Sequence, residues 1–443
     1  MSAASNTVKI AAYIASARER ALPEEVLNAA RLCLADWVSV ALGALDEPAA
    51  KIVHATAQEW HSAGRATVLE GGTACAAVAA LCNGTLAHCL DFDDTYVKGI
   101  THTSAPVWAA VCGLGEERNA TEAEMLRAFV TGFEVSACAG NGLGEAVTAR
   151  GWHGTGIFGR LGAAAASAAL LGLDRETACH ALGLAATQTS GLTASFGTMS
   201  KPFHAGKAAM DGILAAQLAA RGFRAAGNLL DPGAGLDNAV VQDRSVQLAP
   251  ADFSRWEILE NSFKPYAACH LTHPAVDAAR AARALEPDVA RAEAFIAEVG
   301  DLAKQVTGEK NGAPEFSLEG KFDLKYCVAL ALHGYPLSNA DFRDGERPDP
   351  AVLATASRIA VEARPDLTFM SARLSARMPG GKAFTTEIPV AKGHPGNPIA
   401  WPDMWQKFRG LTEDRLGEKC EPVFQKLKAF GRAEPVTLRS LVG

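Results

Sequence analysis

Apolar residues recur at helical spacing from the N-terminus to about residue 260. In residues 23–45 they lie on one face of a helix that Pro23 is well placed to begin. The apolar positions there are Val26, Leu27, Ala30, Leu34, Trp37, Val38 and Ala41. Similar patterns predict helices at 73–90, 104–115, 121–137, 158–171, 174–187 and 205–221. Nearly all are rich in Ala and Gly, which let helix axes approach closely, so we expect a tightly packed helical domain.

The pattern changes after Pro265, where short alternating stretches appear. They predict strands at 294–299, 358–363 and 371–378, and the turn Pro379-Gly380-Gly381 predicts a hairpin that joins the last of them to 383–390. Amphipathic stretches at 402–410 and 415–430 predict helices again. We therefore expect a mainly α protein with a large all-helical domain over 1–262, to which 395–443 return. A smaller α+β domain over 263–394 would be inserted before the C-terminal helices, on two connections that could hinge.

Composition narrows the class of partner. The 443 residues are 49% apolar and 21% charged, the formal net charge is -7, and there is no run of Lys or Arg. These values argue against a nucleic-acid or anionic-membrane surface, so a small molecule is the expected partner. The ten cysteines form no CxxC pair, which argues against a zinc ribbon and a ferredoxin-type cluster. Without a secretory signal pattern or an uncharged apolar run of 18 residues, the protein is expected to be soluble and cytoplasmic.

The most unusual stretch places three carboxylates, a hydroxyl and an imidazole between two apolar segments. It runs from Asp91 through Asp93, Asp94 and Thr95 to His102. A calcium loop is excluded, because its sixth and twelfth positions would be Tyr and His instead of Gly and Glu. A terpene-cyclase DDxxD motif is excluded because its last Asp is missing.

Two interpretations of this stretch stay open on the residues alone. His88, Asp91, Asp93 and His102 are residue types that ligate zinc or magnesium, although their spacing matches no standard motif. Alternatively, the carboxylates are solvated in a loop and the Thr caps a helix. A charge buried beside apolar segments is costly unless it is paired, ligated to a metal or used in a reaction. The other clusters of titratable residues therefore bear on how this stretch is interpreted.

Three further clusters carry imidazole and ammonium groups. His153 lies in the glycine-rich segment 151–156, ahead of an Ala-rich helix whose N-terminus favours anions. Lys201 precedes Pro202, which is expected to be the first residue of the next helix. A cation at that position is disfavoured unless an anion bridges it, so a carboxylate ligand is indicated.

The last cluster, residues 263–273, lies at the expected domain boundary, where small-molecule sites gather. Lys264 opens it, and His270 and His273 are one helical turn apart. Such a pair either ligates a metal or divides into one packed and one solvent-facing ring.

Together, in this order and at these separations, the four clusters resemble the MmgE/PrpD family, which includes 2-methylcitrate dehydratase, cis-aconitate decarboxylase and iminodisuccinate epimerase. The motifs are DFDDT with the His that follows, the glycine-flanked His, Lys-Pro-Phe-His, and the Lys-to-His stretch 264–273. The resemblance implies an inserted α+β lid, a homodimer, and catalysis without metal, iron–sulfur cluster or other cofactor. It places catalytic roles on Asp91, Thr95, His102 and His153, and substrate-binding roles on Lys201, Lys264, His273 and Tyr326.

The family's substrates are citrate-like or succinate-like polyanions, which require cations and a proton carrier. Lys201 and Lys264 would bind carboxylates, helped by His153 and His273. His102 would be the principal acid/base, because imidazole titrates near working pH. Asp91 would orient a histidine or carry a second proton, and Thr95 would donate a hydrogen bond to substrate.

The expected function is therefore a cofactor-independent lyase for a small di- or tricarboxylate, most similar to the hydro-lyase 2-methylcitrate dehydratase. Decarboxylation of a cis-aconitate-like acid and epimerisation of an amino-dicarboxylate are the alternatives. A metal-dependent hydrolase and a noncatalytic carboxylate binder are more remote. Two departures adjoin the expected catalytic histidine: Thr103 stands where Pro is usual, and residues 96–101 form a loop longer than in the decarboxylase.

Overall fold

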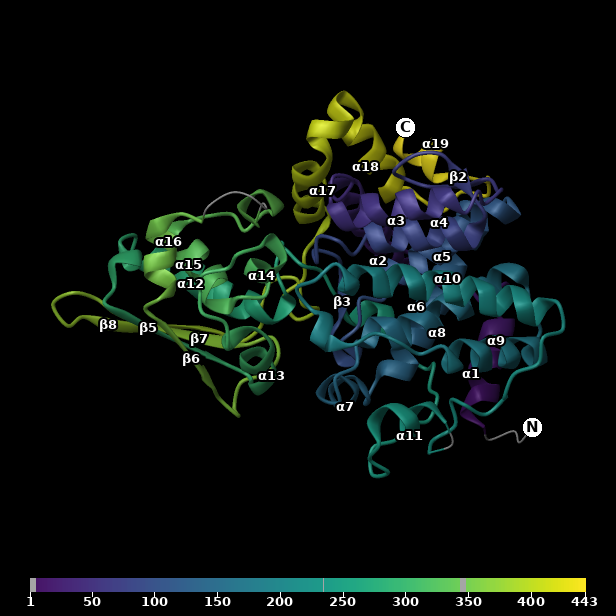
Figure 1. The fold of residues 1–443 in the computed structure, drawn as a ribbon, viewed down its shortest axis with the longest axis horizontal. Helices are drawn as coiled ribbons and strands as arrows, with labels where there is room; N and C mark the ends of the chain where they lie inside the picture. The colour runs from purple at the N-terminus through teal and green to yellow at the C-terminus, as the bar shows by residue number, and fades with distance from the viewer. Residues whose placement is uncertain (1–4, 234, 343–347) are drawn as a thin grey trace. The chain divides into compact units, whose positions relative to one another are not determined.

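The computed structural model describes residues 5–233, 235–342 and 348–443, and these are mainly α-helical (Figure 1). The chain divides into two compact units. The first, called the helical unit below, contains residues 1–89, 93–262 and 404–443. The second, called the sheet unit, contains residues 90–92 and 263–403. The expectation of a mainly α protein is confirmed.

Helices form at each place where the apolar spacing predicted them, and also over 6–15, 48–59, 144–149, 236–241 and 438–442, where it did not. They are α1 (Asn6–Ala15), α2 (Glu24–Gly43), α3 (Pro48–Glu59), α4 (Ala76–Leu86), α5 (Ser104–Arg118), α6 (Glu122–Gly140), α7 (Gly144–Ala149), α8 (Gly154–Leu171), α9 (Arg175–Thr187), α10 (Ser200–Ala220), α11 (Leu236–Val241), α17 (Trp401–Leu416), α18 (Cys420–Lys428) and α19 (Leu438–Val442). Two short antiparallel pairs accompany them, β1 (Ala66–Thr67) with β2 (Thr73–Ala74) and β3 (Thr95–Tyr96) with β4 (Asn261–Ser262). One helix start was predicted wrongly. Pro202 was expected to be the first residue of the helix, but α10 begins at Ser200, so Lys201 lies within its first turn.

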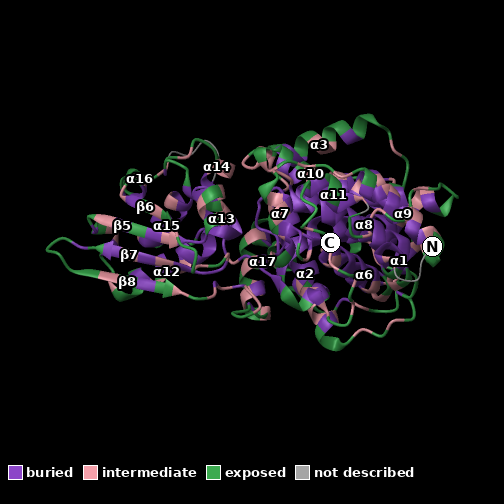
Figure 2. Ribbon diagram, turned by 90° about the horizontal axis from the view of Figure 1, so that it is seen from below, coloured by how far each residue is buried: buried purple, intermediate pink, exposed green. Residues whose placement is uncertain are grey.

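The core of the helical unit is built around α8, which packs against α5, α6, α9 and α10 and is buried over nearly its whole length (Figure 2). Glycines allow these close crossings. A Cβ added at Gly206 of α10 would lie 2.2 Å from the Leu81 carbonyl oxygen of α4. By length and composition α2 and α8 could cross a membrane, but 72% and 94% of their apolar windows are buried in the structure, as in the core helices of a folded domain.

The sheet unit holds a four-stranded mixed sheet in the order β6-β5-β7-β8. The strands are β5 (Ala294–Val299), β6 (Ile359–Ala363), β7 (Ala372–Arg377) and β8 (Ala383–Ile388). Strand β5 pairs parallel with β6 and antiparallel with β7, and β7 and β8 form the predicted hairpin. Helix α12 (His273–Leu285) packs on β7 and β8, and α15 (Leu324–His333) packs on α12. The short helices α13 (Asp301–Ala303), α14 (Ser317–Lys321) and α16 (Pro350–Ala356) complete the unit.

The chain returns to the helical unit after Asp403, nine residues beyond the expected position of 394. Residues 391–393, next to the expected boundary, are bonded to the rest of the sheet unit. Phe263 N donates to Gly393 O at 2.9 Å, and Ala391 N donates to Met370 O at 2.9 Å. The Lys392 amide is also bonded, to the Asp277 carboxylate at 2.8 Å.

The close approach of α4 and α10 gives a stability prediction. Gly206→Ala should lower the free energy of unfolding by about 1–3 kcal/mol or more, because the added methyl meets main-chain oxygen that cannot move aside alone. Gly410→Ala is the matched control: a methyl group added to this glycine of α17 would meet no atom within 4 Å, and Ala favours helix. Thermal unfolding should show a Tm several degrees lower for the first variant only. Equal Tm values would contradict the close crossing.

Candidate active site

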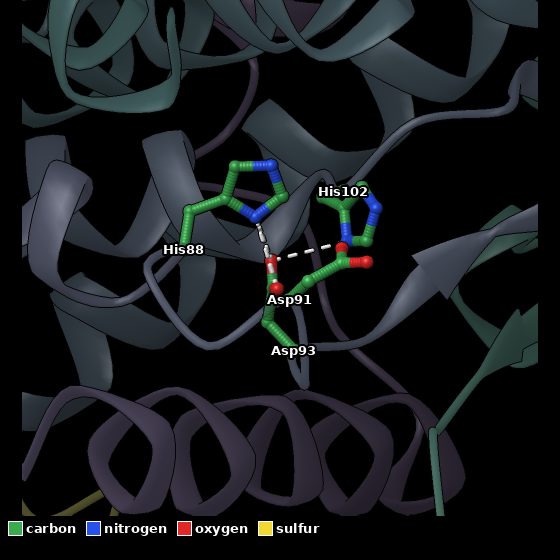
Figure 3. A group of neighbouring side chains, drawn as sticks. All are labelled: His88, Asp91, Asp93 and His102. Carbon is green, nitrogen blue, oxygen red and sulfur yellow. Dashed lines mark hydrogen bonds and ion pairs between the residues drawn. The ribbon is translucent and has the colours of Figure 1, made fainter. Parts of the chain in front are cut away.

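The turn that follows α4 brings together residues of one predicted cluster in the helical unit. The rings of His88 and His102 both face the carboxylate of Asp93 (Figure 3). His88 Nδ1 lies 2.9 Å from both Asp93 oxygens, and His102 Nδ1 makes an ion-pair contact of 3.1 Å with Asp93 Oδ2. The two ring centroids are 4.4 Å apart. The single carboxylate of Asp93 therefore contacts both imidazoles.

Asp93 is fully buried, and its surroundings decide its charge. Burial by itself would raise the pKa of this carboxyl, but the facing imidazoles of His102 and His88 hold the pKa well below its ordinary value. Asp93 is therefore an anion near neutral pH. An ionised carboxylate only accepts hydrogen bonds, which constrains both rings.

Lys201 extends this group from the first turn of α10. Its Nζ lies 3.2 Å from His88 Nε2, so His88 lies between an ammonium and a carboxylate. Lys201 is only 3% exposed, and its ammonium is 5.4 Å from the centre of the Phe196 ring. Within the helical unit, the cluster that ends at His102 and the cluster of Lys201 thus form one connected group.

His153 and His204 lie beside this group, with their Nδ1 atoms 3.1 Å apart. Burial, with the ammonium of Lys201 as the next cause, lowers the pKa of His153 well below its ordinary value. Burial, then Lys201 and Arg160, lower the pKa of His204 to about 4. Both rings are neutral near pH 7. They can share hydrogen bonds with a ligand without adding charge.

Two threonines flank His102. Thr155, in the first turn of α8, accepts a hydrogen bond from the His102 main-chain amide at 3.0 Å and so fixes the backbone there. Thr95 is buried, and its hydroxyl has no hydrogen-bond partner among the described residues. A buried hydroxyl of this kind suits the predicted bond to a substrate oxygen.

Asp94 is an anchor of the turn. It accepts from Asn261 Nδ2 at 2.8 Å and from the Ser104 hydroxyl, and its amide donates to Asp36 Oδ2 at 2.9 Å. Lys407 of α17 bonds the other Asp36 oxygen at 2.6 Å. Burial, followed by the charge of Asp36, raises the pKa of Asp94 to about 7. These contacts tie the turn to α2, α5, β4 and α17.

In the sheet unit, Asp91 is paired with Lys264, a contact that the sequence did not predict. Lys264 Nζ lies 2.6 Å from Asp91 O and 3.0 Å from Asp91 Oδ1, and both side chains are almost fully buried. Asp91 has a φ of 51°, in the left-handed region that a non-glycine residue seldom adopts. Lys321 donates to Leu90 O at 2.8 Å. Two ammonium groups therefore hold this short segment.

The two remaining predicted residues also lie in the sheet unit. His273 starts α12; its Nε2 lies 3.1 Å from Ala268 O, and its ring lies 4.7 Å from that of His270. Tyr326, in the first turn of α15, borders a cavity of about 250 Å³ whose other walls include Phe316, Tyr335 and Asp341.

Sequence reasoning weighed His88 and Asp93 only as metal ligands and gave no role to His204, although the structure places all three in or beside this group. In the helical unit the carboxylate that contacts His102 is Asp93, whereas Asp91 was the predicted orienting carboxylate. Nitrogen and carboxylate donors of His88, Asp93 and His102 lie within 4.8 Å of one another, close enough to hold a divalent ion. The 2.9 Å distance from His88 Nδ1 to Asp93 is also that of an N–H···O hydrogen bond.

The fold and this cluster define a mainly helical two-unit protein with a buried His–Asp–His–Lys group suited to proton transfer beside an anion. The chain belongs to the MmgE/PrpD family. The model of the MmgE/PrpD N-terminal domain matches residues 8–249, and that of the MmgE/PrpD C-terminal domain matches residues 266–430. The resemblance inferred from the motifs is confirmed.

The individual relatives share between a quarter and a third of their aligned residues with this chain. Human cis-aconitate decarboxylase is 28% identical over 357 residues, which cover 76% of this chain and 73% of the relative. The mouse protein of the same name is 27% identical over 352 residues, covering 76% and 72%. Cis-aconitate decarboxylase of Aspergillus terreus is 26% identical over 339 residues, covering 70% and 68%.

The lowered pKa of His204 predicts a pH-dependent stability difference. In the unfolded chain this ring gains its proton near pH 6.5, but in the folded protein only near pH 4, so protonation between these values favours unfolding. His204→Asn removes this contribution. The Tm of the wild type relative to the variant should therefore fall as the pH is lowered from 7 to 4. Parallel Tm-versus-pH curves would contradict the assignment, because all other titrating groups are shared.

Proposed function

We propose that this protein is a lyase that transfers a proton at a carbon next to a carboxylate of a small di- or tricarboxylate. The observation that carries the proposal is the buried group Lys201–His88–Asp93–His102, which combines an ammonium, an ionised carboxylate and an acid/base imidazole. The names of the relatives support the same class of reaction.

We assign a separate role to each residue of the cluster. His102 exchanges the proton, because an imidazole can act as acid and base near neutral pH. Lys201 and the neutral His153 bind a substrate carboxylate, and Thr95 donates to a substrate oxygen. When a proton or CO₂ leaves the carbon, negative charge develops on the adjacent carboxylate, and a buried ammonium stabilises that charge far better than water does.

For the reaction itself we propose decarboxylation of a cis-aconitate-like acid. The carbon–carbon bond would break with loss of CO₂, the electron pair would stay on the carbon, and His102 would deliver the proton. Dehydration, expected first from the sequence, becomes the second candidate: His102 would remove the proton from carbon and pass it to the departing hydroxide, which would leave as water. The departures at Thr103 and in residues 96–101 adjoin His102, so the proposal names the class of substrate and not the individual acid.

Several expectations stay predictions. They are the substrate-binding roles of Lys264, His273 and Tyr326, the catalytic role of Asp91, the lid function of the α+β domain, the homodimer and the cytoplasmic location.

A substrate panel tests the proposal. Purified protein is incubated in D₂O with cis-aconitate, citrate, 2-methylcitrate and amino-dicarboxylates, and the products are identified by NMR. Loss of CO₂ with one deuterium gained would identify decarboxylation, and a new alkene would identify dehydration. Binding of these acids without turnover would favour the carboxylate binder. Stoichiometric metal, with activity lost to a chelator and restored by metal, would favour the hydrolase.

His102→Ala should reduce kcat about a hundredfold or more, because it removes the proton carrier while leaving the fold intact. His180→Ala is the matched control, since the His180 ring bonds the Ala225 carbonyl in another part of the helical unit. The control should keep its rate within about twofold on the substrate found by the panel. A His102→Ala variant of near-normal kcat would remove His102 from the mechanism.

A further inference from the structure

We propose that Asp93 and His88 are positioning residues which, together with Lys201, fix the tautomer of His102 so that Nε2 is the nitrogen that exchanges the proton. The proposal deepens the proposed function, because it rests on His102 as the proton carrier. It concerns only residues of the helical unit.

The first step is the contact between Lys201 and His88. An ammonium group donates hydrogen bonds and cannot accept them. With Lys201 Nζ 3.2 Å from His88 Nε2, that ring nitrogen must be the acceptor. The proton of the neutral His88 ring is then on Nδ1.

The second step is the shared carboxylate. His88 Nδ1 lies 2.9 Å from both Asp93 oxygens, which is the distance of an N–H donor to a carboxylate. Asp93 is thereby held in place by a ring whose tautomer is already set. It can offer nothing but acceptor lone pairs to the second ring, that of His102, at 3.1 Å.

The third step follows for His102. Its Nδ1 must carry a proton to satisfy Asp93, so in the neutral ring Nε2 is the basic nitrogen. The main chain at His102 is fixed by Thr155 Oγ1 at 3.0 Å, which limits rotation of the ring. The charged and titratable groups that face His102 in the helical unit are Asp93, His88 and, at longer range, His153. Asp93 stabilises the protonated ring, and the ammonium of Lys201 beyond His88 limits that effect.

The tautomer can be observed without any reaction. In protein labelled with ¹⁵N-histidine, two-bond ¹⁵N–¹H correlations distinguish Nδ1–H from Nε2–H rings. The His102 signals are identified by their absence in His102→Gln. We expect His102 to be an Nδ1–H ring when neutral. An Nε2–H ring would overturn the inference, and it would do so whether or not the protein is a lyase.

Asp93→Asn tests the consequence for catalysis. The amide removes the negative charge, so the limb of the kcat/KM-versus-pH profile that reports His102 should move to lower pH by about one unit or more. We expect kcat to fall about a hundredfold or more, with KM changed only a few-fold, and His102 to lose its pure Nδ1–H form. Asp93→Glu restores the charge and should return the limb toward its wild-type position.

Asp237→Asn is the matched control, because Asp237 is equally buried and accepts main-chain bonds from Gly233 and Leu248. It should lower stability and leave the pH profile in place. A loss of rate in Asp93→Asn with an unmoved limb would assign Asp93 a merely structural role and overturn the inference. If Asp93→Asn does not fold, the wild-type tautomer decides the question alone.

Discussion

Burial of several carboxylates around one turn is the constraint on which the helical unit depends. An uncompensated buried carboxylate costs several kcal/mol, so each needs a partner. Asp93 has two imidazoles, Asp94 has an amide and a hydroxyl, and Asp36 has an ammonium. The partners of this network come from distant parts of the sequence, at Ser104, Asn261 and Lys407. Charge compensation therefore joins α2, α5, β4 and α17 at the same turn that presents the candidate catalytic groups. A change at any of these partners would act on the site through the position of the turn.

The close packing of small residues is a second constraint on the geometry of the site. Gly84 of α4 and Gly206 of α10 face each other so closely that a Cβ on Gly84 would lie 2.9 Å from the Gly206 Cα. Lys201 lies five residues before this crossing on α10, and His88 lies four residues after it along the chain from α4. The 3.2 Å contact between their side chains needs both segments at this separation. The Ala and Gly bias of the sequence is thus part of how the site is built.

Sequence periodicity predicted the features that depend on local structure. The helices around α8 and the hairpin of β7 and β8 were found because buried faces repeat at fixed spacing. The start of α10 was misplaced because Pro202 tolerates the first turn as well as the first position, and because Lys201 finds an acceptor on His88 that no local rule reveals. The sequence also could not show which of Asp91 and Asp93 contacts His102. They are two residues apart in an irregular turn, where the positive φ of Asp91 decides which direction each carboxylate takes.

Four histidines lie in the cluster, and the geometry separates them. His88 has a donor on one side and an acceptor on the other, so both of its nitrogens are engaged. Burial and Lys201 lower the pKa of His153 and of His204, which keeps these rings from competing for a proton near pH 7. His102 faces the carboxylate that favours its protonated form, while the nearest ammonium lies beyond His88. Asp93 offsets part of the charge that His102 gains with a proton, while the ammonium of Lys201 beyond His88 keeps the neutral form of His102 accessible. That balance is what a residue cycling between acid and base requires.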